Sequence, residues 1–270
     1  MTLSPLVRSV LACPRCRGPL TEVVDEVACD RGHRFPIVAG VPVFSSEGRD
    51  VERRPPDHVS HQPVPGFVER LGARMRPWLH LGAGATNPKP PNSIELETAI
   101  FATTDVVGDA AALPFADGSL SGTLALNVFE HLYDPEASAR ELMRVVEPDG
   151  VLIIQTAFLQ PLHADPSHYF NVTEPGVRRW FRDFDIESVT VPGNFNPLYT
   201  FAWLSSDLLF HASEADRELF ASTTLAEVAE LWRDPARVAG PLGDAFRRLG
   251  DVAQRSLAAG FQVVARRPAG

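Results

Sequence analysis

Between residues 78 and 131, this 270-residue chain contains four short apolar segments, each followed by a glycine or a polar residue. Segments of this kind are typical of the buried strands of a parallel sheet. In an open α/β sheet, ligands bind outside the carboxyl ends of the strands, so the four endings would line one crevice. The expected strands are Trp78 to Leu81 before Gly82-Ala83-Gly84, Ser93 to Glu97, Val106 to Gly108 before Asp109, and Thr123 to Leu126 before Asn127.

The pattern on either side of these segments predicts mainly helices. Asp134-Pro135 and Thr173 are typical helix starts, and apolar residues recur at helical spacing before the first strand. From Pro192 to Gly260 the pattern is amphipathic, which indicates a helical insertion before the last strand. The expected helices are 66–76, 134–146, 173–181, 198–210, 216–232 and 242–257, and the further strands are 151–156, 186–191 and 261–265.

The residues after the strands supply the groups that a nucleoside cofactor needs. A glycine turn lets the backbone approach a ligand closely, and an acid at the end of the second strand can accept hydrogen bonds from ribose hydroxyls. A second acid, after the third strand, can accept one from an adenine amino group. Together with D-x-x-G-D-A-x-x-L-P-F from Asp105 to Phe115 and then Glu130-His131, this set resembles the class I S-adenosylmethionine-dependent methyltransferases.

The resemblance implies an α/β fold with a doubly wound, Rossmann-like sheet, and S-adenosylmethionine as the cofactor. It covers residues 78 to about 181 and the last strand. Glu97 is preferred to Glu95 as the ribose acid, because the family's acid usually stands eight residues before the aspartate that corresponds to Asp105. The implied cofactor-binding residues are Gly82, Ala83, Gly84, Glu97, Asp109, Ala110 and Asn127.

The glycine turn departs from the family's usual G-x-G-x-G. Thr86 stands in place of the third glycine, and a proline-rich loop over residues 87–92 follows it. This predicts that the usual first helix is truncated or absent. The alternative interpretation is a plain nucleotide-fold sheet without an active cofactor site.

All three cysteines lie in the first 29 residues, where they cannot form a disulfide framework. With a histidine they give the spacing C-x2-C-x12-C-x3-H, and tetrahedral zinc needs four N and S ligands of this kind. The predicted metal ligands are Cys13, Cys16, Cys29 and His33, with a small hairpin over 21–28 between them. The alternative is three reduced thiols and a surface histidine.

The segment from about Leu11 to Phe44 resembles zinc ribbons that accompany bacterial methyltransferases, both as N-terminal modules and as small partner subunits. Its ligand spacing is also similar to the zinc module of ribosomal RNA guanine-N1 methyltransferases. We expect residues 1–45 to form the zinc ribbon, 46–65 a linker, and 66–270 the methyltransferase domain, with the helical insertion at 192–260. Separate cores are expected, so that loss of the metal would disorder the ribbon and leave the larger sheet folded.

The loop after the fifth strand contains several titratable side chains near the open end of the sheet. For a hydroxyl acceptor, the enzyme must align the nucleophile and remove its proton, and histidine suits that role at neutral pH. We expect His163 to be the proton acceptor, with Tyr169 beside it, and His131 to be the second choice.

This loop also resembles a sub-branch with the pattern F-L-Q-P-Y-H-x-x-P-x-D-Y-x-R-x-T, from which it departs at His168 and Asn171. Two other interpretations stay open. The loop could be a structural lid whose polar groups bond to each other, or a mononuclear metal site formed by His163, Asp165 and His168.

Charge and composition narrow the functional classes. The chain has 25 basic and 34 acidic residues, a formal net charge of −9, which weighs against nucleic acid and anionic membranes as partners. No signal peptide and no apolar run long enough to cross a bilayer are found, so a cytoplasmic protein is expected.

The resulting functional prediction is methyl transfer to a small-molecule acceptor, such as a natural product or a sugar. The alternatives are a non-catalytic cofactor-fold protein that binds a partner, and an RNA base methyltransferase. In the helical insertion, Trp203, Phe210 and Trp232 would line a substrate pocket or a homodimer interface, or simply form the core of a helical cap.

Overall fold

The computed structural model of the chain describes residues 3–46, 48–55, 65–73, 75–163, 167–233, 239–262 and 266. The chain divides into two compact units. Unit 1 comprises Met1–Phe158 and Tyr169–Val189, and unit 2 comprises Leu159–His168 and Thr190–Gly270. Within the described part of the chain, no helix has the length and apolar character that a bilayer span needs.

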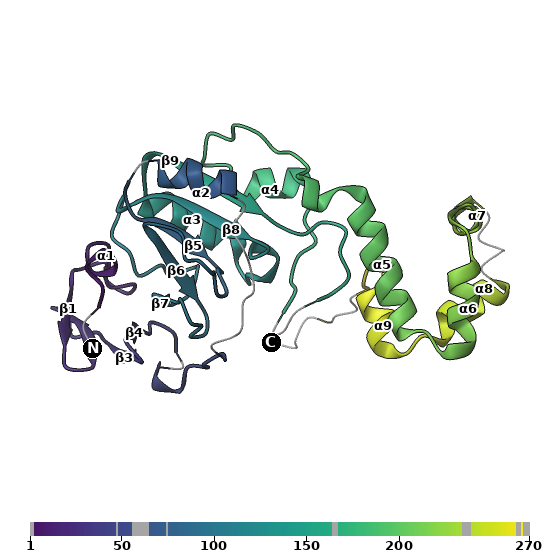
Figure 1. Ribbon diagram of the computed structural model, residues 1–270, viewed down its shortest axis with the longest axis horizontal. Helices are drawn as coiled ribbons and strands as arrows, with labels where there is room; N and C mark the ends of the chain where they lie inside the picture. The colour runs from purple at the N-terminus through teal and green to yellow at the C-terminus, as the bar shows by residue number, and fades with distance from the viewer. Residues whose placement is uncertain are drawn as a thin grey trace. The chain divides into compact units, whose positions relative to one another are not determined.

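A parallel five-stranded sheet is the centre of unit 1 (Figure 1). Its strand order is β7-β6-β5-β8-β9, and all four pairings are parallel. Every residue of β5 and β8 is buried, as expected for strands covered on both faces. The strands are β5 (Trp78–Leu81), β6 (Ser93–Glu97), β7 (Val106–Val107), β8 (Leu120–Leu126) and β9 (Val146–Gln155). The predicted mixed α/β fold is confirmed at this level.

Different segments cover the two faces of the sheet. On one face, Leu71 of α2 (Pro65–Gly72) packs with Trp78 and Leu124. On the other, Leu142 of α3 (Pro135–Val145) packs with Leu79 and other strand residues. The predicted helix start is confirmed, because Asp134 caps α3 by accepting a hydrogen bond from the Ala137 N–H at 2.8 Å.

Two predicted boundaries on this side of the chain differ from the structure. The helix before β5 ends at Gly72 rather than continuing to residue 76. Strand β9 begins at Val146, although residues 147–150 read as a turn. The pairing with β8 shifts register between Leu120 and Gly122, so the Glu147–Gly150 segment is accommodated as an irregularity within the strand.

The connection from β5 to β6 is a loop, and no residue from Gly82 to Asn92 is helical. The expected absence of the first helix is therefore confirmed. Polar side chains on the covered sheet face bind this loop, because its backbone has no helical hydrogen bonds of its own. The Trp78 Nε1–H donates to the Pro91 carbonyl at 3.0 Å, and the Ser93 hydroxyl donates to the Pro90 carbonyl at 2.7 Å.

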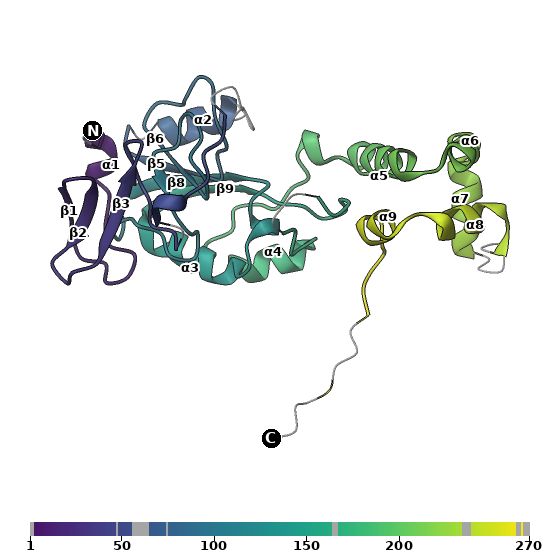
Figure 2. The same ribbon diagram turned by 90° about the horizontal axis from the view of Figure 1, so that it is seen from below.

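An N-terminal module forms a four-stranded sheet with the order β1-β2-β3-β4, whose strands β1 to β3 lie side by side (Figure 2). Its first two strands pair antiparallel, which confirms the predicted hairpin. The elements are α1 (Pro5–Arg8), β1 (Leu20–Val23), β2 (Glu26–Cys29), β3 (Arg34–Val38) and β4 (Val41–Pro42). The Ser4 hydroxyl caps α1 by accepting from the Val7 N–H at 3.2 Å.

The N-terminal module has a small buried cluster of its own, and it is also attached to the larger sheet. Val7 and Val10 belong to the same buried cluster as the strands of the parallel sheet. The Ala12 N–H donates to the Pro114 carbonyl at 2.9 Å, and the Phe44 N–H donates to the Val107 carbonyl at 2.8 Å. The module is therefore bonded to the larger sheet at two places, because its backbone continues the pairing beyond its own small sheet.

Part of the predicted linker is also attached to unit 1. After η1 (Gly48–Asp50), the Arg54 N–H donates to the Ile100 carbonyl, and the Ile100 N–H donates to the Glu52 carbonyl, each at 2.8 Å. Residues 56–64 of the linker lie outside the described part of the chain.

Unit 2 consists of short helices. Ala212, Phe220, Ala245, Leu249 and Ala253 form its buried cluster. The predicted helices over 216–232 and 242–257 are each divided in two, by a break at Thr223–Thr224 and by another at Leu249–Gly250. The helices are α5 (Pro197–His211), α6 (Glu214–Ser222), α7 (Leu225–Arg233), α8 (Pro241–Arg248) and α9 (Asp251–Ser256), preceded by η3 (Gly193–Phe195).

Two predicted strands are not found in the described residues. Residues 186–191 form no strand, although Ile186 packs against the core of unit 1. An alternating pattern does not suffice without a neighbouring strand to pair with. Phe261 and Gln262 are likewise not in a strand, and Phe261 is 67% exposed. The rest of that predicted strand, residues 263–265, lies outside the described residues.

Candidate cofactor crevice and metal cluster

The glycine turn after β5 needs its glycines for steric and conformational reasons. Gly82 and Gly84 have φ values of +63° and +64°, a region that side chains disfavour. A Cβ atom on Gly82 would also collide with the side chain of Val128, which follows β8. Ala83, between the two glycines, is fully buried. The turn therefore brings the ends of β5 and β8 into direct contact.

Glu97 and Glu95 lie on the same side of β6 but have different surroundings. Glu97 is the last residue of the strand and is half-buried, and its carboxylate accepts a hydrogen bond from the Gly84 N–H. Glu95 is fully buried and accepts a hydrogen bond from the Thr86 hydroxyl. Burial raises the pKa of Glu95, against the opposing effect of its hydroxyl partners. Of the two acids, Glu97 is therefore the one that is partly exposed beside the glycine turn.

The other predicted cofactor residues follow β7 and β8. Asp109 is exposed, and its carboxylate accepts a hydrogen bond from the Ala111 N–H at 2.8 Å. Ala110 is buried beside it. Asn127 has a φ of +56°, and its N–H donates to the Gln155 carbonyl at 2.9 Å. The structure places all of these residues at the carboxyl edge of the sheet in unit 1.

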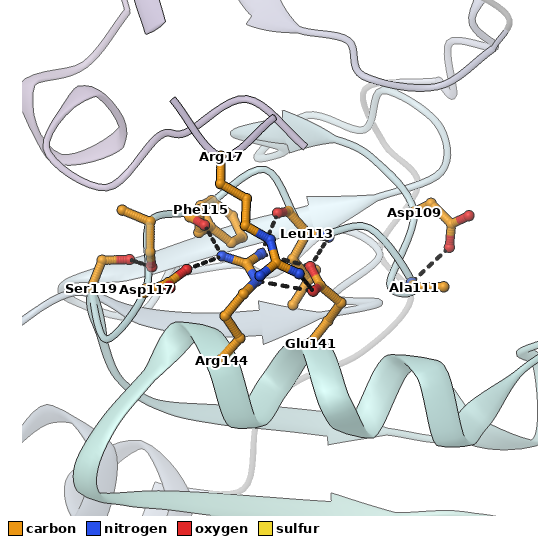
Figure 3. A network of polar contacts seen from close by, with 10 residues as sticks. Arg17, Asp109, Ala111, Leu113, Phe115, Asp117, Ser119, Glu141 and Arg144 are labelled. Carbon is orange, nitrogen blue, oxygen red and sulfur yellow. Dashed lines mark hydrogen bonds and ion pairs between the residues drawn. The ribbon is translucent and has the colours of Figure 1, made fainter. Parts of the chain in front are cut away.

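Arg144 of α3 fixes the loop that carries Asp109 (Figure 3). Its guanidinium donates to the carbonyl oxygens of Phe115, at 2.6 Å, and Leu113, at 2.9 Å. It also binds the carboxylates of Glu141, at 2.6 Å, and Asp117, at 2.8 Å. Only 10% of the Arg144 side chain is exposed. The helical pattern predicts that Arg144 faces water, and this prediction is wrong, because the pattern does not show that the loop of residues 113–117 packs against that side of the helix.

The predicted metal ligands come together in the N-terminal module. One ligand atom from each of Cys13, Cys16, Cys29 and His33 lies within 4.8 Å of the others. The His33 Nδ1 is 3.4 Å from the Cys13 sulfur and 3.3 Å from the Cys29 sulfur. Burial tends to raise the pKa of Cys29, but hydrogen bonds, chiefly from the His33 backbone, outweigh it and lower the pKa to about 6. A donor set of three sulfurs and one imidazole fits a tetrahedral metal ion.

The predicted catalytic residues fall in both units. In unit 1, His131 ends the short helix η2 (Phe129–His131), and Tyr169 is 48% exposed with its ring 5.6 Å from that of Tyr133. In unit 2, His163 lies beside other rings, with centroid distances of 4.4 Å to His168 and 4.8 Å to Trp203. Asp165 lies outside the described residues.

Comparison with known proteins gives matches to methyltransferases. Residues 86–154 match a family model described as a methyltransferase domain. An uncharacterized methyltransferase from Mycobacterium sp. (strain KMS) is 40% identical over 57 residues, 21% of this chain and 23% of the relative. The 2-methyl-6-phytyl-1,4-hydroquinone methyltransferase of Synechocystis sp. is 40% identical over 70 residues, 26% of this chain and 20% of the relative.

Among solved structures, a putative methyltransferase from an antibiotic biosynthesis pathway of Anabaena variabilis is 15% identical. The superposition covers 72% of this chain and 93% of that protein, with a TM-score of 0.37. The chain spans less than a quarter of the length of the first curated relatives that it matches. The sequence matches support a methyltransferase domain here, with S-adenosylmethionine as the cofactor that such a domain implies.

Replacing Arg144 by Met should lower the free energy of unfolding of the chain by about 3–5 kcal/mol. The substitution leaves the Glu141 carboxylate without its main partner and two loop carbonyls without donors. Arg140 of the same helix is exposed, and its replacement by Met should change stability by less than about 0.5 kcal/mol. Denaturant unfolding of both variants measures the difference, and equal losses would contradict the role given to Arg144.

Proposed function

We propose that this chain is an S-adenosylmethionine-dependent methyltransferase that acts on a small-molecule acceptor. The order of the strands is the observation that carries the proposal. Asp109 follows β7, Glu97 ends β6, and the glycine turn follows β5, and these three strands are adjacent in the sheet. A nucleoside bound along this edge would have its adenine at Asp109 and its ribose at Glu97. Its 5′ substituent would then lie at the glycine turn.

Each residue at this edge has a role that its surroundings support. The Glu97 carboxylate would accept hydrogen bonds from the ribose hydroxyls, and it retains acceptor capacity beside the Gly84 N–H. The exposed Asp109 would accept from the adenine amino group, while Ala110 and Asn127 line the same edge. The bound cofactor supplies an activated methyl group on sulfur. The protein has to hold that group in line with the nucleophile.

We propose His163 as the group that accepts the proton of the nucleophile. Its Nδ1 is 2.9 Å from the Pro161 carbonyl oxygen, which can only accept a hydrogen bond. In the neutral ring, Nδ1 is therefore the donor and Nε2 carries the lone pair that a general base needs. The Trp203 ring lies beside His163 and provides an apolar surface next to the imidazole. Tyr169 would orient the acceptor, and His131 remains the second choice for the base.

We also propose one structural zinc ion per chain, held by Cys13, Cys16, Cys29 and His33. The four ligand atoms already lie close together, and two of the cysteines are buried in the module's own small cluster. Such an ion would hold the turns of the N-terminal module together, as in a zinc ribbon. Because the module is bonded to the loop around Asp109, its folding affects the cofactor edge as well.

The zinc proposal predicts about one zinc per chain in protein purified without added zinc. His33→Ala should lower the zinc content, because it removes one of four ligands. His211→Ala is the matched control, since His211 lies in unit 2 and should leave the content unchanged. Mass spectrometry of metals measures both. Removal of zinc by a chelator should lower the melting temperature of unit 1. An N-terminal module that stays folded without zinc would contradict the proposal.

Calorimetry with S-adenosylmethionine tests the proposed cofactor. Glu97→Ala should weaken binding by about 1–3 kcal/mol, because the ribose hydroxyls lose their acceptor. Glu69→Ala, on the exposed side of α2, is the control and should bind as the wild type does. A wild-type protein that binds neither S-adenosylmethionine nor its demethylated product would favour the non-catalytic, partner-binding alternative. Normal binding by Glu97→Ala would remove Glu97 from the ribose site.

The role of His163 is tested by turnover with the acceptor that a substrate screen identifies. His163→Ala should slow methyl transfer by about 10²–10⁴-fold, the usual contribution of a general base, with cofactor affinity nearly unchanged. His211→Ala serves again as the control. Unchanged turnover in His163→Ala would reduce this loop to a structural lid. The screen should begin with small molecules and test RNA afterwards, because the net charge of −9 disfavours binding to a phosphate backbone.

A further inference from the structure

Glu130, in the short helix η2 that follows β8, is a buried carboxylate that the proposed reaction does not use. Its side chain is completely buried. One carboxylate oxygen, Oε2, accepts a hydrogen bond from the Thr156 hydroxyl at 2.9 Å. The other oxygen, Oε1, is buried and has no hydrogen-bond partner among the described residues. Buried polar atoms without a partner are uncommon in folded proteins, and a buried carboxylate oxygen in this state can accept a hydrogen bond from a bound ligand or a water molecule.

The position of Glu130 is fixed by its own backbone. Its carbonyl oxygen accepts hydrogen bonds from the Tyr169 N–H, at 2.7 Å, and the Phe170 N–H, at 3.1 Å. Two residues earlier, Val128 packs against Gly82 of the glycine turn. Thr156, the partner of the carboxylate, directly follows β9. Glu130 therefore lies at the carboxyl edge of the sheet, where β8 and β9 end beside the turn.

The strand order indicates which part of a ligand Glu130 would meet. From β7 to β9, the edge presents Asp109, Glu97, the glycine turn and then Glu130 with Thr156. A cofactor with its adenine at Asp109 and its ribose at Glu97 extends its 5′ substituent across the turn towards β8. In S-adenosylmethionine and its demethylated product, that substituent ends in an amino acid with a positively charged ammonium group.

We infer that the Glu130 Oε1 accepts a hydrogen bond from the ammonium group of the cofactor's amino-acid end. An ammonium has three donors, and an ion pair with a buried carboxylate is stronger than a neutral hydrogen bond. This inference rests on the proposed function.

Two nucleosides that differ in the amino-acid end provide the test. S-adenosylhomocysteine carries the ammonium group, and 5′-methylthioadenosine has the same adenine and ribose without it. Calorimetry of both on the full chain should show that Glu130→Gln weakens S-adenosylhomocysteine binding by about 10–100-fold, on the scale of a hydrogen bond to a charged group. The affinity for 5′-methylthioadenosine should stay within about twofold of the wild type. Glu97→Ala is the matched comparison and should weaken both ligands alike.

A measurement on the wild type alone covers the case in which Glu130→Gln does not fold. The analogue of S-adenosylhomocysteine that lacks only the amino group should bind about 10–100-fold more weakly than S-adenosylhomocysteine itself. Equal affinities for these two ligands overturn the inference. So does a Glu130→Gln variant that weakens both nucleosides equally or neither. A wild type that binds none of these nucleosides overturns the proposed function instead, which separates the two failures.

Discussion

The loop from Gly82 to Asn92 connects the buried strands β5 and β6, and its backbone polar groups need hydrogen-bond partners. A helix would satisfy its own backbone, but this connection has no helical hydrogen bonds. The strands supply partners instead: the Trp78 and Ser93 side chains donate to loop carbonyls, and Glu97 accepts from the Gly84 N–H. This explains why polar side chains occupy strand positions that are usually apolar. Both acids of β6 contact the loop, but they differ in burial: Glu95 is fully buried beside the Thr86 hydroxyl, and Glu97 is half-buried at the end of the strand.

The loop that carries Asp109 is held from several directions. Arg144 of α3 donates hydrogen bonds to two of its carbonyl groups. The N-terminal module binds the chain on both sides of Asp109, at Val107 and at Pro114. Ala12, which makes one of these bonds, is adjacent to the metal-ligand candidate Cys13. The proposed zinc site and the proposed cofactor site therefore lie in one compact unit.

Local patterns predicted much of unit 1. The five strands of the sheet were placed within a few residues, because buried parallel strands leave short apolar runs in the sequence. Helix starts at Asp134 and Thr173 were predicted from capping residues and confirmed. The strand predicted over 186–191 was wrong, because pairing needs a neighbour that local alternation does not provide. The two long helices predicted over 216–232 and 242–257 are each interrupted. The amphipathic pattern continues across both breaks and therefore did not predict them.

The sequence by itself determined the order of the elements, the acids and glycines at the strand ends, and the spacing of the cysteines, since all of these depend on neighbours along the chain. Only the tertiary structure decided which carboxylates are buried. Glu95 accepts a hydrogen bond from Thr86, and burial raises its pKa. The Glu130 carboxylate accepts from the Thr156 hydroxyl, and its backbone carbonyl accepts from the Tyr169 N–H. Thr156 and Tyr169 are remote from Glu130 in sequence, and burial depends on how such distant segments pack. Neither the attachment of the N-terminal module nor the unpaired oxygen of Glu130 could therefore be read from the pattern.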